Sequence, residues 1–392
     1  MIRLNLSAFS KISKIAYLAA FITFCMRAGH FMSLPFLAIY LSNDGLLSPG
    51  QIGLVLGISG FMVGSTGLIN GMYVDRSSHK KVILVTLFLS GFCYFAFSVS
   101  IHNFFMLLFI NAALGWLRSL TEISVITLSI NHTKPENLSY AFNARFIGGN
   151  LGVVLGPLIG ALMARQHSML IFWIAGGINL ALGAIMCLCK VNEHTRSPIK
   201  NDSLLMHFRS IIKEKLLIYL TLINFILWFV YSSLDTTLPQ YLAETWKDPA
   251  TVFSTLMITN AIICVLFQPI ILRWAELTSL RIFGIIGCLM FSISFLMLSV
   301  CSNLILMIIA VIFMSFAELF TMPINALLMM RKAPKHLIGG YNGLFSFSLL
   351  GLSVGPFLGG YGLQYIGGPV TFFIAALVPF IAVFIYFRYI PK

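Results

Sequence analysis

Gly152-Val-Val-Leu-Gly156-Pro157-Leu-Ile-Gly160 recurs 199 residues later as Gly351-Leu-Ser-Val-Gly355-Pro356-Phe-Leu-Gly359. At the same offset Pro135 aligns with Pro334, and Asn143 aligns with Asn342. The chain therefore contains an internal duplication. Two similar halves around one central site are typical of transporters, in which the halves rock against each other to move a solute across a bilayer.

The composition indicates a membrane protein. Hydrophobic residues make up 59% of the 392 positions and charged residues only 9%, whereas a soluble domain carries about 25% charged residues. A spanning helix needs about 20 mostly apolar residues. Twelve stretches meet this requirement: 15–42, 51–72, 81–100, 103–130, 141–164, 168–190, 215–243, 251–272, 280–300, 303–329, 339–363 and 368–389. The sequence predicts an all-α membrane protein with twelve transmembrane helices in two pseudo-symmetric six-helix bundles.

One long polar stretch divides the chain. We expect an N-terminal bundle over 1–190, a cytoplasmic linker over 191–214 and a C-terminal bundle over 215–392. Of the 25 Lys and Arg, 20 lie at the termini or in loops on the same side of the membrane, and the opposite loops hold only Arg165 and Lys247. Positive loops stay cytoplasmic, so both termini are predicted to be cytoplasmic in a multi-pass protein of a bacterial inner membrane. The net charge of +13 then reflects topology and anionic lipids, and nucleic acid is not an expected partner.

The seven cysteines lie in or at the ends of apolar spans. Cys187 and Cys189 could supply two ligands, but a structural zinc needs four. We therefore expect no metal and no cofactor. Gly351-Leu-Ser353-Val-Gly355 matches the nucleophile pattern of hydrolases, but that pattern requires a strand before it and a soluble sheet around it. The sequence predicts no enzyme.

The loop between the second and third spans reads Gly71-Met-Tyr-Val-Asp75-Arg76-Ser-Ser78-His79-Lys80-Lys81. It resembles the loop signature of the major facilitator superfamily, with Ser78 where that family usually has glycine. The resemblance implies that Asp75 and Arg76 belong to a cytoplasmic gate, with Gly71 and Lys80 in the same motif. Arg145 could reach Asp75 across this gate.

The glycine motif quoted above places small residues four apart on one helical stripe, which lets two helix backbones approach closely. It resembles the antiporter signature that the same superfamily carries in its fifth span, although Ala161 replaces the final glycine. The resemblance implies proton-driven export. Symmetric helix packing would also produce the motif twice, and that reading stays open.

Six ionisable residues besides histidines interrupt the spans: Arg27, Arg118, Glu122, Arg145, Asp235 and Glu318. An ionised group at the bilayer centre costs about 2.5–3.5 kcal/mol on insertion scales, so each should face the interior and have a partner or a function. Arg118 and Glu122 are four residues apart and can pair along their own helix. In the superfamily that this chain resembles, spans one, four, seven and ten line the cavity, and all six residues except Arg145 lie on those spans.

Candidate substrate-cavity residues lie on the first, fourth and seventh spans: Arg27, His30, Arg118, Trp228 and Tyr231. Arg27 and His30 are one turn apart on one helical face. A mid-span histidine can instead be a hydrogen-bonded packing residue. We align Leu34-Pro35 of the first half with Leu238-Pro239 of the second.

Three carboxyls are candidates for binding the coupling proton. An apolar bundle disfavours the ionised form of a carboxyl, so such a group can load and release a proton near neutral pH. Glu318 ranks first, Asp235 second and Glu122 third, because Arg118 would keep Glu122 ionised. We expect a monomeric secondary transporter that exports small amphipathic compounds in exchange for protons by alternating access. Proton-coupled import of an organic metabolite or a metal chelator such as a siderophore is the alternative.

Overall fold

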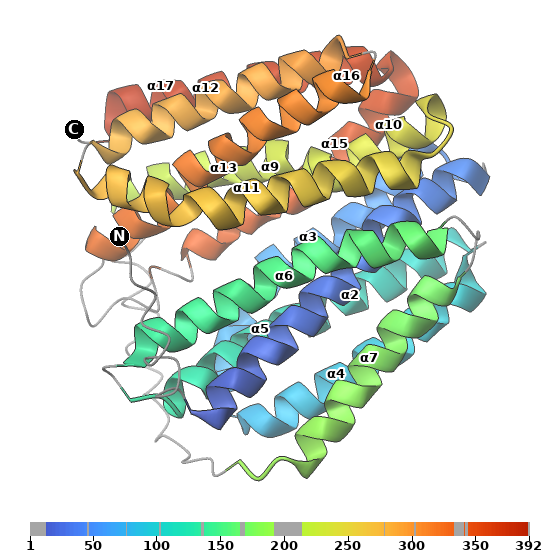
Figure 1. Cartoon of the computed structure of the whole chain (residues 1–392), viewed down its shortest axis with the longest axis vertical. Helices are drawn as coiled ribbons and strands as arrows, with labels where there is room; N and C mark the ends of the chain where they lie inside the picture. Colours follow the sequence, from blue (N-terminus) through green and yellow to red (C-terminus); the bar gives the residue numbers. More distant parts are fainter. Residues whose placement is uncertain are drawn as a thin grey trace.

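The computed structural model describes residues 13–44, 47–75, 77–101, 103–134, 137–164, 169–191, 214–277, 279–301, 303–332, 341 and 344–390, which are almost entirely helical (Figure 1). The first half holds α2 (Lys14–Asp44), α3 (Pro49–Asp75), α4 (His79–Ser100), α5 (Phe104–Asn131), α6 (Leu138–Ala164) and α7 (Leu170–Leu188). The second half holds α9 (Lys215–Asp235), α10 (Thr237–Thr245), α11 (Pro249–Leu277), α12 (Leu280–Ser299), α13 (Leu304–Lys332), η2 (Phe347–Leu350), α15 (Gly351–Ile366), α16 (Gly368–Leu377) and α17 (Pro379–Tyr389).

Within the described residues, eleven helical segments are long and apolar enough to cross a membrane. The pairs α9 and α10, and α16 and α17, each count as one segment. Helix α3 is not among the eleven. At about 1.5 Å per residue its 27 residues are nevertheless long enough to span a bilayer. The predicted all-α membrane fold is confirmed, with α3 as the remaining span.

The helices separate into two bundles, α2–α7 and α9–α17, which lie one below the other in Figure 1. Residues 192–213 of the predicted linker lie outside the described residues. Because α7 ends at Leu188 and α9 begins at Lys215, we propose 1–190 and 215–392 as the two domains.

The duplicated glycine motif packs the same pair of helices in each bundle. A Cβ placed on Gly152 of α6 would lie 2.8 Å from Arg27 Cβ of α2, and one placed on Gly351 of α15 would lie 2.9 Å from Trp228 Cβ of α9. Only glycine allows these backbones to approach so closely. The motif therefore fixes α6 against α2 and α15 against α9.

The remaining motif glycines extend this correspondence. Gly156 faces the Ala28 carbonyl, and its copy Gly355 faces the Phe229 carbonyl. Gly160 faces the Phe36 ring, and its copy Gly359 faces Thr237 Oγ1. Each contact residue on α2 thus corresponds to a residue on α9 or α10 that is 201 positions later. Pro157 and Pro356 lie inside α6 and α15 at equivalent positions.

This packing corrects the predicted alignment of Leu34-Pro35 with Leu238-Pro239. At an offset of 201 the counterpart of Leu34 is Asp235. The two prolines are therefore not equivalent. Pro239 has no N–H, and its ring clashes with the carbonyl four residues earlier, at Asp235. Helix α9 ends at Asp235 and α10 begins at Thr237, whereas α2 continues through Pro35 to Asp44.

Helices α3 and α15 join the two bundles along a row of small residues. A Cβ on Gly57 would lie 2.7 Å from the Ser353 carbonyl oxygen, and one on Gly60 would lie 2.6 Å from the Leu352 backbone. Towards the other end, a Cβ on Gly67 would approach only Ser346 Oγ at 3.3 Å, and one on Gly71 would meet nothing within 4 Å. Close packing between the bundles therefore begins at the Pro49 end of α3 and ends before Gly71.

Two further contacts join the bundles at the Pro49 end. Ser254 Oγ of α11 donates a hydrogen bond to the Pro157 carbonyl of α6 over 2.7 Å. The ring of Phe36 on α2 meets that of Phe253 on α11 edge to face, with centroids 5.9 Å apart. In a two-bundle transporter, close packing at one end with looser packing at the other is one of the two states that alternating access requires.

Candidate functional site

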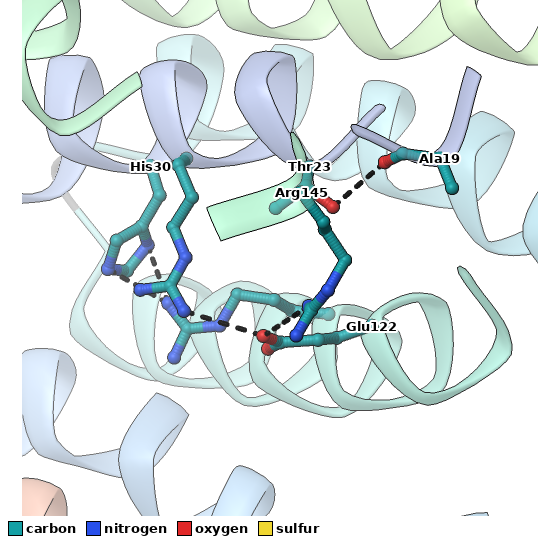
Figure 2. A network of polar contacts seen from close by, with 7 residues as sticks. Ala19, Thr23, His30, Glu122 and Arg145 are labelled. Atoms are coloured by element: carbon teal, nitrogen blue, oxygen red, sulfur yellow. Dashed lines mark hydrogen bonds and ion pairs between the residues drawn. The ribbon is translucent and has the colours of Figure 1, made fainter. Parts of the chain in front are cut away.

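Glu122 of α5 lies between two arginines in the N-terminal bundle (Figure 2). Arg27 Nη2 is 3.4 Å from Glu122 Oε1, and Arg145 Nη1 is 3.8 Å from the same oxygen. The side chains of Arg27 and Glu122 are 47% and 38% exposed, whereas that of Arg145 is 17% exposed. Arg27 thus reaches Glu122 from α2 and Arg145 reaches it from α6, with most of Arg145 covered by protein.

Arg118 points to His30 rather than along its own helix. Its Nη1 lies 2.7 Å from His30 Nδ1 and 2.8 Å from Nε2. A guanidinium can only donate hydrogen bonds, so the imidazole nitrogen that accepts one carries no proton. The pairing of Arg118 with Glu122 that the four-residue spacing allowed is not formed. His30 instead draws the guanidinium towards α2, and Arg27 takes its place at Glu122.

Glu318 of α13 has only uncharged hydrogen-bond partners among the described residues. Asn260 Nδ2 of α11 donates to Glu318 Oε2 over 3.2 Å and to Ser315 Oγ over 3.0 Å. Cys264 Sγ donates to the same carboxyl oxygen over 3.6 Å. An amide and a thiol can stabilise either form of a carboxyl without fixing its charge. Among the described residues, no cation therefore holds this carboxyl ionised through a hydrogen bond.

Asp235 lies at the break between α9 and α10. Its Oδ1 is buried and has no hydrogen-bond partner within the described part of the chain. One turn earlier on α9, Tyr231 is buried and its ring meets that of Trp228 edge to face, with centroids 5.6 Å apart. The C-terminal wall of the site thus combines a carboxyl with two aromatic rings.

The two sets of residues lie on helices of opposite bundles that contact each other. Helix α2, which carries Arg27, packs against α10, which begins just after Asp235, and against α11, whose Asn260 holds Glu318. Arg27 is half exposed although it sits near the middle of a 31-residue helix. Because α2 contacts α10 and α11 of the opposite bundle, we infer that the exposed side of Arg27 faces the space between the bundles.

A family model described as Major Facilitator Superfamily matches residues 19–349 and 220–392. The chain belongs to the major facilitator superfamily. It is an integral, multi-pass membrane transporter and not an enzyme.

Three relatives within the superfamily cover most of the chain. An MFS-type transporter of Bacillus subtilis, YqjV, is 28% identical over 86% of this chain and 83% of its own length. The quinolone resistance protein NorA of Staphylococcus aureus is 25% identical over 89% of both chains. A Na(+), Li(+), K(+)/H(+) antiporter of Planococcus maritimus is 22% identical over 81% of this chain and 82% of its own length.

Among solved structures, a mutant of the nucleoside transporter NupG has the same fold. Its TM-score is 0.83, at 13% identity, and the match covers 96% of this chain and all of the other. At this identity the likeness shows the superfamily fold alone.

The gate residues expected from the superfamily loop signature are only partly described. The side chain of Asp75 and the whole of Arg76 lie outside the described residues. Arg145 lies at Glu122, and its expected contact with Asp75 falls on a side chain outside the described residues. A Cβ on Gly71 would meet none of the described residues within 4 Å, so among them Gly71 makes no close helix contact in this state.

Lys80 has a role within its own bundle. Its Nζ donates to the Cys189 carbonyl over 2.7 Å and to the Cys187 carbonyl over 3.2 Å, at the C-terminal end of α7. In the second half Arg281, 201 positions later, donates in the same way to the Phe387 carbonyl in the last turn of α17. A cation at a helix C-terminus satisfies the free carbonyls and the helix dipole. The pair therefore holds the last helix of each bundle in place.

Two features of the site were missed in the sequence. Asn260 and Cys264 hold Glu318, but an amide and a thiol in an apolar span carry no distinctive pattern. The glycines of α3 do form a pattern, with spacings of three and four residues from Gly50 to Gly71. That spacing marks a helix face suited to close contact and could have predicted the interface with α15.

Proposed function

We propose that this transporter exports small amphipathic organic compounds in exchange for protons. The observation that carries the proposal is the pair of carboxyls on the C-terminal wall, Asp235 and Glu318. Neither has a basic partner in hydrogen-bond contact among the described residues, and both lie in the bundle opposite Arg27. Carboxyls that no fixed cation neutralises can bind and release protons as the surrounding cavity opens and closes.

The mechanism is competition between the proton and the solute for the central site. With the carboxyls protonated, their attraction for Arg27 is lost and the two walls separate more easily. With the carboxyls ionised, Arg27 and the opposite wall attract each other. Each ligand shifts a two-state equilibrium only by its differential affinity for the two states.

Helix packing supports rocking of the bundles as the moving step. The α3 and α15 interface is closed at the Pro49 end and loose at Gly71. Under the proposed topology, with both termini cytoplasmic in the bacterial inner membrane, this state opens towards the cytoplasm. We propose that the monomer is the transporting unit, because one chain supplies both walls.

The relatives favour export over import. NorA is described as a resistance protein, and the relative from Planococcus maritimus is described as an antiporter. The antiporter-type motif over Gly152–Gly160 agrees with them.

Proton-coupled import of an organic metabolite or a chelator such as a siderophore remains the second candidate. The surplus of arginine on the N-terminal wall favours it, because Arg27, Arg118 and Arg145 face a single carboxyl, Glu122. Such a wall suits an anionic nutrient as well as an exported compound.

The experiment compares everted and right-side-out vesicles that contain the full chain. An imposed proton gradient drives transport of a panel of amphipathic amines, zwitterions and carboxylic acids, and a pH-sensitive dye reports dissipation of the gradient. Proton-coupled export predicts uptake into everted vesicles together with dissipation. Gradient-driven uptake into right-side-out vesicles would instead establish import.

Glu318→Gln tests the coupling residue. We expect gradient-driven uptake to fall to the level of vesicles without the protein, while exchange of the compound at equal pH persists. Glu122→Gln is the matched control, because Glu122 is held by arginines, and it should retain most gradient-driven uptake. Unchanged gradient-driven transport in Glu318→Gln would remove Glu318 from this role.

A further inference from the structure

Arg27 and Trp228 occupy equivalent places in the two bundles. Gly152 faces the Phe24 carbonyl, Arg27 Cβ and the Ala28 nitrogen, and Gly351 faces the Phe225 carbonyl, Trp228 Cβ and the Phe229 nitrogen. All three pairs share the offset of 201. The pseudo-twofold axis therefore sets a guanidinium on one wall at the same depth as an indole on the other.

The same offset pairs His30 with Tyr231. His30 contacts Arg118 on the N-terminal wall, and Tyr231 contacts Trp228 on the C-terminal wall. The positions that carry Arg27 and the Arg118-bound His30 on the N-terminal wall thus carry the aromatic rings of Trp228 and Tyr231 on the C-terminal wall. This division of polarity suits a ligand with an acidic group at one end and a flat apolar body at the other.

The contact between Arg27 and Glu122 can be displaced. It consists of one oxygen at 3.4 Å, although a guanidinium can bind a carboxylate through two parallel hydrogen bonds, and both side chains are well exposed. Arg145 supports Glu122 from the covered side. Glu122 therefore keeps one cationic partner if Arg27 turns to another carboxylate.

We propose that Arg27 is the subsite for a carboxylate of the transported compound, that Trp228 and Tyr231 hold its aromatic body, and that Glu122 occupies Arg27 as an internal competitor until the compound arrives. This rests on the proposed function only in placing the solute between the bundles. It deepens that function by assigning aromatic organic acids as the substrate class: in a zwitterion, the carboxylate would bind Arg27 while the cationic group competes with protons for Asp235 and Glu318.

Equilibrium binding to the full chain in nanodiscs tests the subsite without any gradient. Three radiolabelled probes share one ring and differ in charge: 1-naphthoate, neutral 1-naphthamide and cationic 1-naphthylmethylammonium. Binding to empty nanodiscs is subtracted. The wild-type protein should bind the anion tightest, by about tenfold over the amide, as expected for gaining a charge-assisted hydrogen bond.

Arg27→Gln should remove this preference while leaving binding of the amide unchanged, and Arg27→Lys should restore part of it. Glu122→Gln should tighten binding of the anion by about two- to fivefold, because the competitor is lost. Trp228→Ala should weaken binding of the anion and of the amide by the same factor.

Three results would overturn the proposal. The wild-type protein could bind the cation more tightly than the anion, or it could bind no probe saturably. Alternatively, Arg27→Gln could lose affinity equally for all three probes. If Arg27→Gln fails to fold, judged by thermal unfolding, Glu122→Gln decides on its own, and weaker or unchanged anion binding there contradicts the competition. Proton coupling is measured separately in Glu318→Gln, so the two proposals fail independently.

Discussion

The two bundles share their packing and differ in their chemistry. In both, a glycine motif fixes the fifth helix of the bundle against the first, and a cation caps the last helix, Lys80 in one and Arg281 in the other. Yet the N-terminal wall carries the arginines with one carboxyl, and the C-terminal wall carries two carboxyls with aromatic rings. Duplication thus preserved the contacts that the backbone requires, while the cavity positions diverged.

The difference arises because helix packing and site chemistry use different faces of the same helices. Gly152 and Gly351 meet backbone atoms, where any added side chain would clash in either bundle. At the equivalent positions Arg27 and Trp228, only the Cβ touches the motif glycine, so the rest of the side chain could change between the bundles. Symmetry therefore predicts stability effects that are equal in the two bundles and transport effects that are not.

The largest expected effect is at Asp235, whose counterpart in the other bundle is the apolar Leu34. Asp235→Asn removes a buried carboxyl from the coupling wall, so gradient-driven transport should fall to background while the protein stays folded. Dye-reported dissipation in everted vesicles measures the coupling, and thermal unfolding controls for the fold. Full coupling in this variant would leave Glu318 as the single coupling acid of the C-terminal wall.

A smaller effect, on stability, is expected at the duplicated glycines. Gly152→Ala and Gly351→Ala each force a Cβ against the backbone of the neighbouring helix and should destabilise the protein by about 1–3 kcal/mol. The two losses should agree, since the contacts match. Gly177→Ala in α7 is the control, because its Cβ would meet nothing within 4 Å.

Unfolding in denaturant measures all three alanine variants. A large loss for one motif glycine and none for its copy would contradict the packing symmetry of the bundles.

The smallest effect is expected at the helix caps. Lys80→Met and Arg281→Met each remove a cation from carbonyls at a helix C-terminus, so each should cost about 0.3–1 kcal/mol. Transport should remain in both. If Lys80→Met abolishes transport without a stability change while Arg281→Met does not, Lys80 also acts in the gate that the loop signature implied.

The spans and the packing motif were predictable because they depend on local sequence. Twelve apolar stretches and two glycine motifs define the helices and two of their contacts without reference to distant residues. The gate and cavity were harder, since each depends on side chains from several helices. Arg118 and Glu122 illustrate this, because their spacing allowed them to pair along α5. In the structure two residues of α2 contact them instead: His30 contacts Arg118, and Arg27 contacts Glu122.

The coupling site shows the same limit. Glu318 stood out because a carboxyl in an apolar span is costly, whereas Asn260 and Cys264 became recognisable only when α11 packed against α13. The alignment of Leu34-Pro35 with Leu238-Pro239 was wrong by three residues. The offset of 201 holds on both sides of the break between α9 and α10, so the two prolines are not equivalent, which a proline motif alone does not reveal.

The sequence by itself determined the class, the duplication and the superfamily of this protein, because hydrophobicity, glycine spacing and loop charge act along the chain. Only the tertiary structure decided which arginine holds Glu122, which helix face meets the opposite bundle, and that Arg27 stands where the other half has Trp228. Those facts depend on distances between helices, and distances are set when the helices pack.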